Sequence, residues 1–387
     1  MKNVCMAVSA YLVGFSIASL PLAAQSGDLL RELARPPLEH VDSPASGPPG
    51  YGPQRMLTAY SFKKVRERGK GQVIAVVDAF DDPNVEVDLS TFTAQFSQPS
   101  CTTENGCFKL VYEGGTKPPA DISGWSNEIA IDTQWAHSIA PEAVILLVEA
   151  QSNSFADLLS AVDTAVANGA TIVSMSWVGS ETADETSYDT HFNVPGVMFV
   201  AASGDDGHGV SYPAASPYVV GVGGTTLTIN SNGTWESETA WSDSGGGQSQ
   251  YETEPSYQEG VQTSGKRGVP DVAYDGNPST GIPSYSSYSC GACYTGWQQW
   301  GGTSIGTPEW AALFARANAI RVLNGKAPLT EPQTILYPLN ELGFHDITSG
   351  SNGNCGTLCT AGPGYDYVTG LGSLIADDLV VKLAGSQ

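Results

Sequence analysis

The chain alternates between short, almost uninterrupted apolar runs and longer segments in which apolar residues recur at helical spacing. Apolar runs rich in Val, Ile and Ala are typical of strands that are covered on both faces, as in parallel sheets. The segments between them end at Gly, Asn or Pro and fit helices that connect one strand to the next. The predicted strands are 72–80, 143–150, 170–177, 196–205 and 218–229, and the predicted helices are 84–96, 123–141 and 155–169.

This alternation predicts an α/β fold with a mostly parallel central sheet covered by helices on both faces. From about 230 to 300 the chain is rich in Gly, Ser and Tyr, which predicts loops with short strands. The following stretch, QQWGGTSIGTPEWAALFA, predicts a helix just after Ser304, with Thr307 as its N-cap and Pro308 in its first turn. A serine among glycines at a helix N-terminus is a candidate nucleophile, because the N–H groups there favour negative charge.

Acidic residues lie at or just after the ends of three predicted strands: Asp78, Glu149 and Asp205. In open α/β sheets, chemistry gathers at the carboxyl ends of the strands, so these side chains are candidates for a site. A dinucleotide site is the rival for this architecture. It is excluded because DAFDDPN follows the first strand, with no GxGxxG to hold a pyrophosphate.

The N-terminal residues have the form of a secretory signal, with an early lysine, an apolar stretch and a Leu-Ala-Ala end. We expect a signal peptide over 1–24 and a short pro-segment or linker, rich in Pro, Gly and Ser, over 25–50. Residues 51–387 then form one large domain. No later segment is apolar for long enough to span a membrane, so we expect a secreted protein, extracellular or, in a Gram-negative source, periplasmic.

Six cysteines remain after the signal peptide, in three close pairs: Cys101/Cys107, Cys290/Cys293 and Cys355/Cys359. An even number in an exported chain predicts disulfides, here as local staples on loops. A redox or zinc motif at Cys290-Gly-Ala-Cys293 is disfavoured, since no second CxxC or nearby histidine supports it.

The composition is strongly acidic, with 40 Asp and Glu against 17 Lys and Arg and a formal charge of −23. Such a surface excludes nucleic acid and anionic membranes as partners at neutral pH. The acid excess is either a device for solubility or a sign that the protein works in acid, where protonation relieves self-repulsion. Composition alone leaves both explanations open.

A serine nucleophile needs a base, and none of the five histidines has a sequence context that nominates it. His137, on the predicted helix 123–141, fits a packed or surface position. The same helix carries Glu128 and Asp132, which are four residues apart and therefore project from one face. An exposed acidic face is the default explanation for such a pair. Two adjacent carboxyl groups can also share a proton, which leaves one of them able to act as a base in acid.

Several motifs occur together and in order along the chain: Glu-x-x-x-Asp before Ala140-Pro141, SGD at 203–205, and GTS at 302–304 before Pro308. This set resembles the sedolisin family of serine-carboxyl peptidases. The likeness extends from YGPQRMLTAY at 51–60 to VTGLGS at 368–373. It implies a subtilisin-like three-layer sandwich and an acid-active endopeptidase that cleaves unfolded polypeptides as a monomer.

The resemblance also implies a role for each matching residue. Ser304 matches the nucleophile, Glu128 the general base and Asp132 the residue that orients Glu128. Asp205 matches the aspartate of the oxyanion hole, with the N–H of Ser304 as the second donor. Asp205 must be protonated to donate a hydrogen bond while Glu128 must be ionised to accept a proton, and both conditions hold together only in acid.

A second constellation, FHDITSGSNGNC followed by AGPGYDYVTG, offers carboxylates and turns that can direct backbone carbonyls inward. Oxygen ligands of this kind suit calcium, although Gly/Asp turns explain the pattern about as well. In the resemblance this is the family's calcium site. One Ca²⁺ ion is therefore expected, with ligands from Asp346, Ile347, Gly362, Gly364 and Asp366.

The chain departs from the family pattern in two places. Only residues 25–50 stand where relatives usually carry a long folded pro-domain, so the chain either folds without that chaperone or has a short segment that blocks the site until it is removed. Glycine also replaces the serine that relatives more often have before Gly302-Thr303-Ser304. Two alternatives stay open: a catalytically silent, calcium-bound binding protein of the same fold, and a peptidase with a histidine-based triad active at neutral pH.

Overall fold

The computed structural model describes residues 29–41, 47–339 and 342–385, and the predicted signal peptide lies outside them. Among the described residues, no helix is both long and apolar enough to cross a membrane. The main sheet has the order β16-β17-β13-β9-β7-β5-β2-β4-β3, with β10 paired to β9. Its strands are β2 (Val73–Ala79), β3 (Phe108–Tyr112), β4 (Val144–Ala150), β5 (Ile172–Met175), β7 (Met198–Ala202), β9 (Val219–Ile229), β10 (Trp235–Ala240), β13 (Val272–Asp275), β16 (Phe344–His345) and β17 (Ser373–Leu374).

The strands from β3 to β17 pair in parallel. Within this sheet only β16, at one end of the path, and β10, which lies off the path against β9, pair antiparallel. The predicted α/β fold with a mostly parallel sheet is therefore confirmed. The helices are α1 (Pro53–Ala59), α2 (Val85–Gln95), α3 (Trp125–Ile139), α4 (Phe155–Ala167), α5 (Thr303–Leu323), α6 (Gln333–Leu339) and α7 (Ala376–Ala384). All predicted strands and helices before residue 230 are present, with ends that differ by a few residues.

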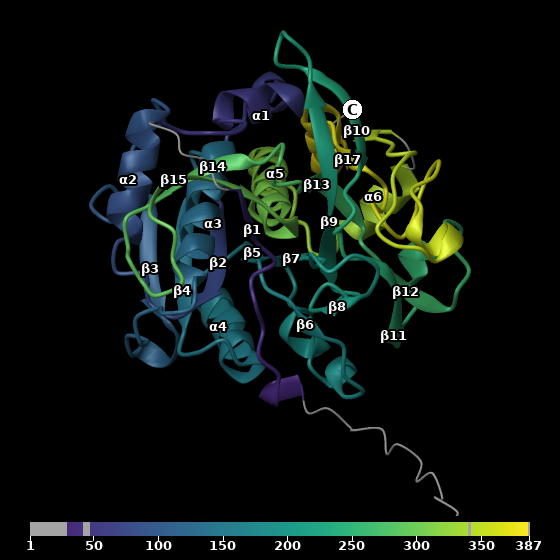
Figure 1. Cartoon of the computed structure of the whole chain (residues 1–387), viewed down its shortest axis with the longest axis horizontal. Coiled ribbons are helices and arrows are strands. Elements are labelled where there is room, and N and C mark those ends of the chain that lie inside the picture. The colour runs from purple at the N-terminus through teal and green to yellow at the C-terminus, as the bar shows by residue number, and fades with distance from the viewer. Residues whose placement is uncertain (1–28, 42–46, 340–341, 386–387) are drawn as a thin grey trace, which may run out of the picture.

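Helices cover both faces of the sheet, so the molecule has three layers (Figure 1). One apolar core holds residues of α2, α3, α5 and α7, and a second core on the other face holds residues of α4. All fifteen residues of α3 are buried. This helix lies between the sheet, α5 and β14 (Ile282–Ser286), so its polar side chains face protein and not water.

The prediction that a helix begins after Ser304 is wrong by one turn. Helix α5 begins at Thr303, its N-cap is Gly302, and Thr307 donates its hydroxyl to the Thr303 carbonyl (3.1 Å). Pro308 lies inside the helix, where it has no N–H to give to the carbonyl of Ser304. The hydroxyl of Ser176, at the end of β5, reaches that carbonyl at 3.4 Å and compensates.

Residues 29–41 begin as a short 3-10 helix (Leu29–Arg31) and then cross the molecule as an extended segment, which Figure 1 shows in purple beside α5. Its last part, β1 (Glu39–Val41), pairs antiparallel with β15 (Gly296–Gly301), which also pairs with β14. Two further small sheets complete the fold: β11 (Gly247–Thr253) with β12 (Lys266–Val269), and β6 (Gly179–Ser180) with β8 (Ser211–Tyr212).

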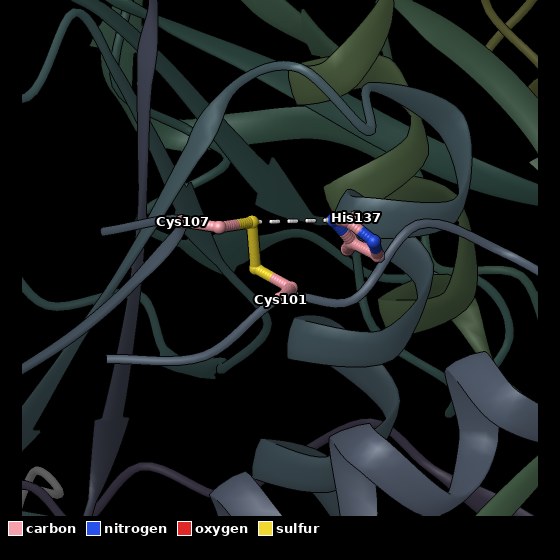
Figure 2. A group of neighbouring side chains, drawn as sticks. All are labelled: Cys101, Cys107 and His137. Carbon is pink, nitrogen blue, oxygen red and sulfur yellow. Dashed lines mark hydrogen bonds between the residues drawn. A yellow bond between two sulfur atoms is a disulfide. The ribbon is translucent and has the colours of Figure 1, made fainter. Parts of the chain in front are cut away.

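The three predicted disulfides are confirmed, and each closes a short loop, with sequence separations of 6, 3 and 4 residues. Figure 2 shows Cys101–Cys107 beside the imidazole of His137. His137 is buried, its Nε2 lies 2.8 Å from the Pro99 carbonyl oxygen, and burial lowers its pKa. It lies more than two turns along α3 from Glu128, and the expectation of a packed position is confirmed.

Candidate active site

Ser304 lies in the first turn of α5, at the carboxyl end of the central strands. Its backbone N–H is among the first four of the helix, which have no partner within the helix. Its hydroxyl donates a hydrogen bond to the carbonyl oxygen of Pro37, 2.7 Å away, and the whole residue is buried. The candidate nucleophile is therefore hydrogen-bonded to a peptide carbonyl group of the chain itself.

Glu128 and Asp132 are both fully buried on α3, one helical turn apart. Burial raises the pKa of Glu128 well above its usual value, and the neighbouring charges of Asp132 and Asp78 raise it further, while the Ser304 hydroxyl lowers it. Burial also raises the pKa of Asp132, and the Ser176 hydroxyl opposes this. The pair is thus not an exposed acidic face. The two carboxyl groups lie beside Ser304, where they can keep one shared proton while the other proton is released.

Asp121 fixes the start of the helix that carries this pair. Its buried carboxylate accepts hydrogen bonds from the N–H groups of Ser123, Gly124 and Ser126, at 2.7 to 3.1 Å. The N–H of Ser126 is one of the orphan donors in the first turn of α3, and those of Gly124 and Ser123 lead into it. A carboxylate at this end of the helix also interacts favourably with the helix dipole. Asp121 did not emerge from the sequence, because it lies outside the predicted helix and belongs to no motif.

Asp205 follows β7 and contacts the residue before the nucleophile. Its Oδ1 accepts hydrogen bonds from the N–H and the hydroxyl of Thr303, both at 2.8 Å. Its Oδ2 is buried and has no hydrogen-bond partner. Burial raises the pKa of Asp205 to about 7, against the opposing effect of the two Thr303 bonds. In acid the carboxyl group is therefore protonated, and Oδ2 is the oxygen left free to donate a hydrogen bond.

Gly302 leaves space for these groups to meet. Its φ is +123°, and a Cβ there would stand 2.2 Å from the Pro37 carbonyl oxygen and 2.7 Å from Asp205 Oδ2. The carbonyl oxygen and the unpartnered carboxyl oxygen thus flank the same small volume next to Ser304. This is the arrangement that an oxyanion hole requires.

Two of the three acidic strand ends predicted from the sequence meet in the sheet. Asp78 on β2 lies directly opposite Glu149 on β4, and both are buried. Burial raises the pKa of Asp78 well above its usual value, and the charges of Asp132 and Glu149 add to this. Asp78, one of the strand-end candidates, therefore belongs to the electrostatic surroundings of the Glu128–Asp132 pair.

The segment before Pro37 binds the rest of the protein through its backbone. Ala34 donates its N–H to Asn153 at 2.8 Å, and Arg35 and Val178 exchange two N–H···O bonds, both at 3.0 Å. After Pro37, β1 adds to the edge of β15. Residues 33–41 thus lie as an extended strand, with main-chain pairing on both sides of the Ser304 contact. Extended peptides that bind a sheet edge use the same kind of pairing.

The residues of the predicted calcium site converge on one loop. The N–H of Gly364 lies 3.2 Å from both carboxylate oxygens of Asp346, and the N–H of Gly362 donates to Asp366 Oδ2 at 3.0 Å. Asp366 and Ile347 are buried, and burial raises the pKa of Asp366. Two carboxylates beside the backbone carbonyls of a glycine loop supply the hard oxygen donors that Ca²⁺ takes, so the residues fit the ion.

A further group of carboxyl side chains lies close enough together for their charges to interact: Glu181, Glu185, Asp189 and Glu252. Burial raises the pKa of Glu185 to about 9, and the charge of Glu181 raises it too. Burial likewise raises the pKa of Glu252 to about 8 and that of Asp189 to about 6. These groups hold their protons well above the pH at which free carboxyl groups lose them.

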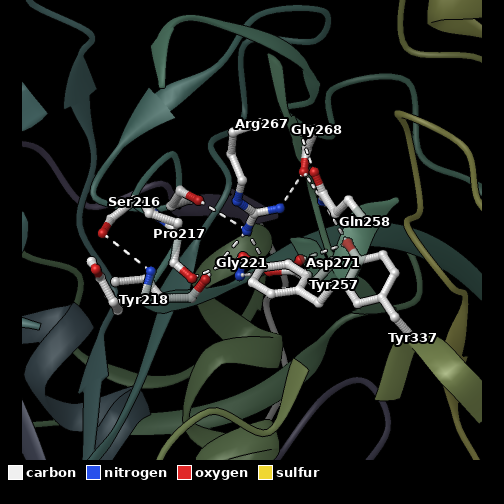
Figure 3. A network of polar contacts seen from close by, with 12 residues as sticks. Ser216, Pro217, Tyr218, Gly221, Tyr257, Gln258, Arg267, Gly268, Asp271 and Tyr337 are labelled. Carbon is white, nitrogen blue, oxygen red and sulfur yellow. Dashed lines mark hydrogen bonds and ion pairs between the residues drawn. The ribbon is translucent and has the colours of Figure 1, made fainter. Parts of the chain in front are cut away.

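Asp271 belongs to a buried network of polar side chains (Figure 3). Its carboxylate accepts from Arg267 at 2.6 Å, from the hydroxyl of Tyr337 at 2.7 Å and from the N–H of Gly221 at 2.8 Å. Arg267 and Asp271 are both fully buried. The network ties β12 to β9, and its role is structural.

Comparison with known proteins gives concordant matches. The Subtilase family model matches residues 121–334. Kumamolisin from Bacillus sp. (strain MN-32) is 34% identical over 383 residues, which cover 89% of this chain and 65% of that protein. Sedolisin from Pseudomonas sp. (strain 101) is 36% identical over 204 residues, which cover 46% of this chain and 33% of that protein. The chain thus spans 65% or less of the length of these relatives.

A solved structure is similar over most of the chain. Pseudomonas sedolisin, a serine-carboxyl proteinase in complex with two molecules of pseudo-iodotyrostatin, superposes with a TM-score of 0.76 at 27% identity. The match covers 88% of this chain and 99% of that one. The likeness therefore applies to the overall fold of the chain.

Proposed function

The chain belongs to the sedolisin family of subtilases, and from this premise we propose that it is an exported, acid-active serine-carboxyl endopeptidase. The observation that carries the proposal is the contact of the Ser304 hydroxyl with a peptide carbonyl, between a buried carboxyl pair and an unpartnered carboxyl oxygen. Unfolded polypeptides are the proposed substrates, because the backbone pairing seen for residues 33–41 needs an extended chain. We propose that the enzyme acts as a monomer.

In the proposed reaction the Ser304 oxygen attacks the substrate carbonyl carbon while its proton passes to Glu128. Asp132, one turn along α3, orients Glu128 and shares the charge of the pair. The carbonyl oxygen becomes an oxyanion in the space beside Gly302, where protonated Asp205 donates from Oδ2. Glu128 then gives the proton to the leaving amine, and water repeats the sequence on the acyl-enzyme.

The activity is expected to fall as pH rises through about 7, because Asp205 then loses the proton that it donates to the oxyanion. In Asp205→Asn the amide keeps an N–H donor at every pH. This variant should lose about 10²-fold in kcat. Its kcat should no longer fall near pH 7, because residue 205 then has no proton to lose. The measurement is kcat on an unfolded protein from pH 2 to pH 8. A neutral optimum in the unaltered protein would instead favour a histidine base.

We further propose that 1–24 are a signal peptide and that 25–50 act as a pro-segment for the peptidase domain 51–387. Ser304, Glu128 and Asp132 have no solvent exposure while residues 33–41 occupy the site, so a substrate cannot reach them. The bond over the nucleophile joins Pro37 to Leu38. Its cleavage would free the cleft and start activity.

We propose that one Ca²⁺ ion binds Asp346 and Asp366 with the backbone carbonyls of Ile347, Gly362 and Gly364. A chelator is expected to lower Tm by about 5–10 °C, since an ion that binds only the folded state stabilises it by mass action. Asp366→Asn should abolish this difference, and Asp378→Asn, an exposed aspartate on α7, should keep it. Equal Tm values with and without chelator in the unaltered protein would refute the site.

The catalytically silent binding protein is less consistent with these observations. Such a protein has no need of a buried carboxyl pair beside a serine, or of a carboxyl oxygen left without a partner. Both features persist here.

A further inference from the structure

The side chain of His40, in the extended segment 33–41, lies in a pocket on β15. Its imidazole stacks on the Tyr294 ring with centroids 3.8 Å apart and an interplanar angle of 22°. The Trp300 ring lies 4.9 Å away at 59°, and His40 Nε2 is 2.7 Å from the side-chain oxygen of Gln298. Tyr294 and Trp300 also meet edge to face at 5.5 Å, so the two rings form the walls of one pocket.

The pocket is held in place by elements of the active site. The backbone of Tyr294 exchanges two hydrogen bonds with the side chain of Asn127, at 2.8 and 2.9 Å. Asn127 precedes the candidate base Glu128 on α3. The disulfide Cys290–Cys293 ends one residue before Tyr294 and closes the loop that presents it. A ring anchored in this way needs little ordering when a ligand binds.

Gln298 gives the pocket a defined polarity. Its amide nitrogen donates to the carbonyl of Thr295 at 2.7 Å, which leaves the amide oxygen facing His40 as an acceptor. An incoming side chain therefore needs an N–H or O–H donor at its edge and a flat face for Tyr294. Histidine and tryptophan satisfy both requirements, phenylalanine satisfies only the second, and aliphatic side chains satisfy neither.

The register follows from the Ser304 contact. If Pro37 contributes the carbonyl that is attacked, Leu38 is the first residue after the scissile bond and His40 is the third. Trp300 lies directly opposite His40 in the β1–β15 ladder, so another chain paired in this way places its third residue in the same pocket. We propose that Tyr294, Trp300 and Gln298 form a specificity subsite for a flat, donor-bearing side chain three residues after the scissile bond. This rests on the proposed peptidase function.

The test uses peptides that differ only at this third position, cut by the full chain after incubation in acid. We expect kcat/KM to be about three- to tenfold higher with His or Trp than with Ala, the range given by one aromatic pair. Tyr294→Ala should remove the preference and Tyr294→Phe should retain it. Tyr251→Ala, which changes a comparably exposed tyrosine on β11, serves as the matched control.

Equal rates across the series, or a preference that survives in Tyr294→Ala, would overturn the subsite while leaving the peptidase function intact. Failure to cut any peptide would count against the function instead. The subsite is then tested in the full Ser304→Ala chain, by carbethoxylation of His40 followed by mass spectrometry. Adding Tyr294→Ala should speed this modification several-fold, whereas an unchanged rate would refute the pocket.

Discussion

Replacing Ser304 by Ala, or Glu128 by Gln, is expected to lower kcat/KM on an unfolded protein by about 10⁴-fold or more. Each substitution removes a group that acts in the bond-forming step. When catalytic groups act as a unit, removing one of them abolishes nearly the whole rate enhancement that they give together. The double variant should therefore be little worse than either single one. Both variants should also keep the Pro37–Leu38 bond intact in acid, which intact-mass measurement would show.

The matched controls are Ser237→Ala and Glu236→Gln, the same chemical changes on exposed positions of β10. They should cleave substrate and process the N-terminal segment as the unaltered chain does. Full activity in Glu128→Gln would show that the proton goes elsewhere. Removal of the segment at an undiminished rate by a purified Ser304→Ala chain would refute Pro37–Leu38 as a self-cleaved bond.

Substituting Gly302 by Ala should cost about 10²- to 10³-fold in kcat/KM, the loss seen when an oxyanion-hole donor is removed. The new Cβ would lie in the space between the substrate carbonyl and Asp205, and φ of +123° strains any residue with a side chain. The measurement is steady-state kinetics at the optimal pH, with circular dichroism to confirm folding.

Gly296→Ala separates backbone strain from obstruction. Gly296 begins β15, the strand that ends one residue before Gly302. Its φ is +81°, but a Cβ there would meet nothing within 4 Å. We expect this control to lose some stability and to keep most of its activity. If Gly302→Ala were no more damaging than Gly296→Ala, the space beside Gly302 would not be where the oxyanion forms.

The sheet and the helices before residue 230 could be predicted because strands that are buried on both faces consist of nearly uninterrupted apolar residues, which the sequence shows directly. The start of α5 could not. Thr307 and Pro308 carry strong local signals for a helix start, yet Asp205 accepts the N–H of Thr303 from outside the segment and extends the helix back by a turn. A contact between residues 98 apart overrides local preference.

The candidate site, too, could be predicted only in part from the sequence. Spacing placed Glu128 and Asp132 on one face, but carboxyl groups four residues apart fit an exposed surface equally well. Only the packing of α3 against α5 and β14 shows that this face is buried. The supporting roles of Ser176 and Asp121, and the path of residues 33–41, depend on contacts across the fold and left no local pattern to recognise.

The buried carboxyl groups around Glu185, Glu252 and Glu149 have a thermodynamic consequence for the whole molecule. Their pKa values in the folded state, about 9, 8 and 8, lie above those of an unfolded chain. The folded state therefore binds more protons. Its extra stability is complete below about pH 4 and fades as pH rises through 8 to 9. Through these groups the folded state is therefore less stable at neutral pH than in acid.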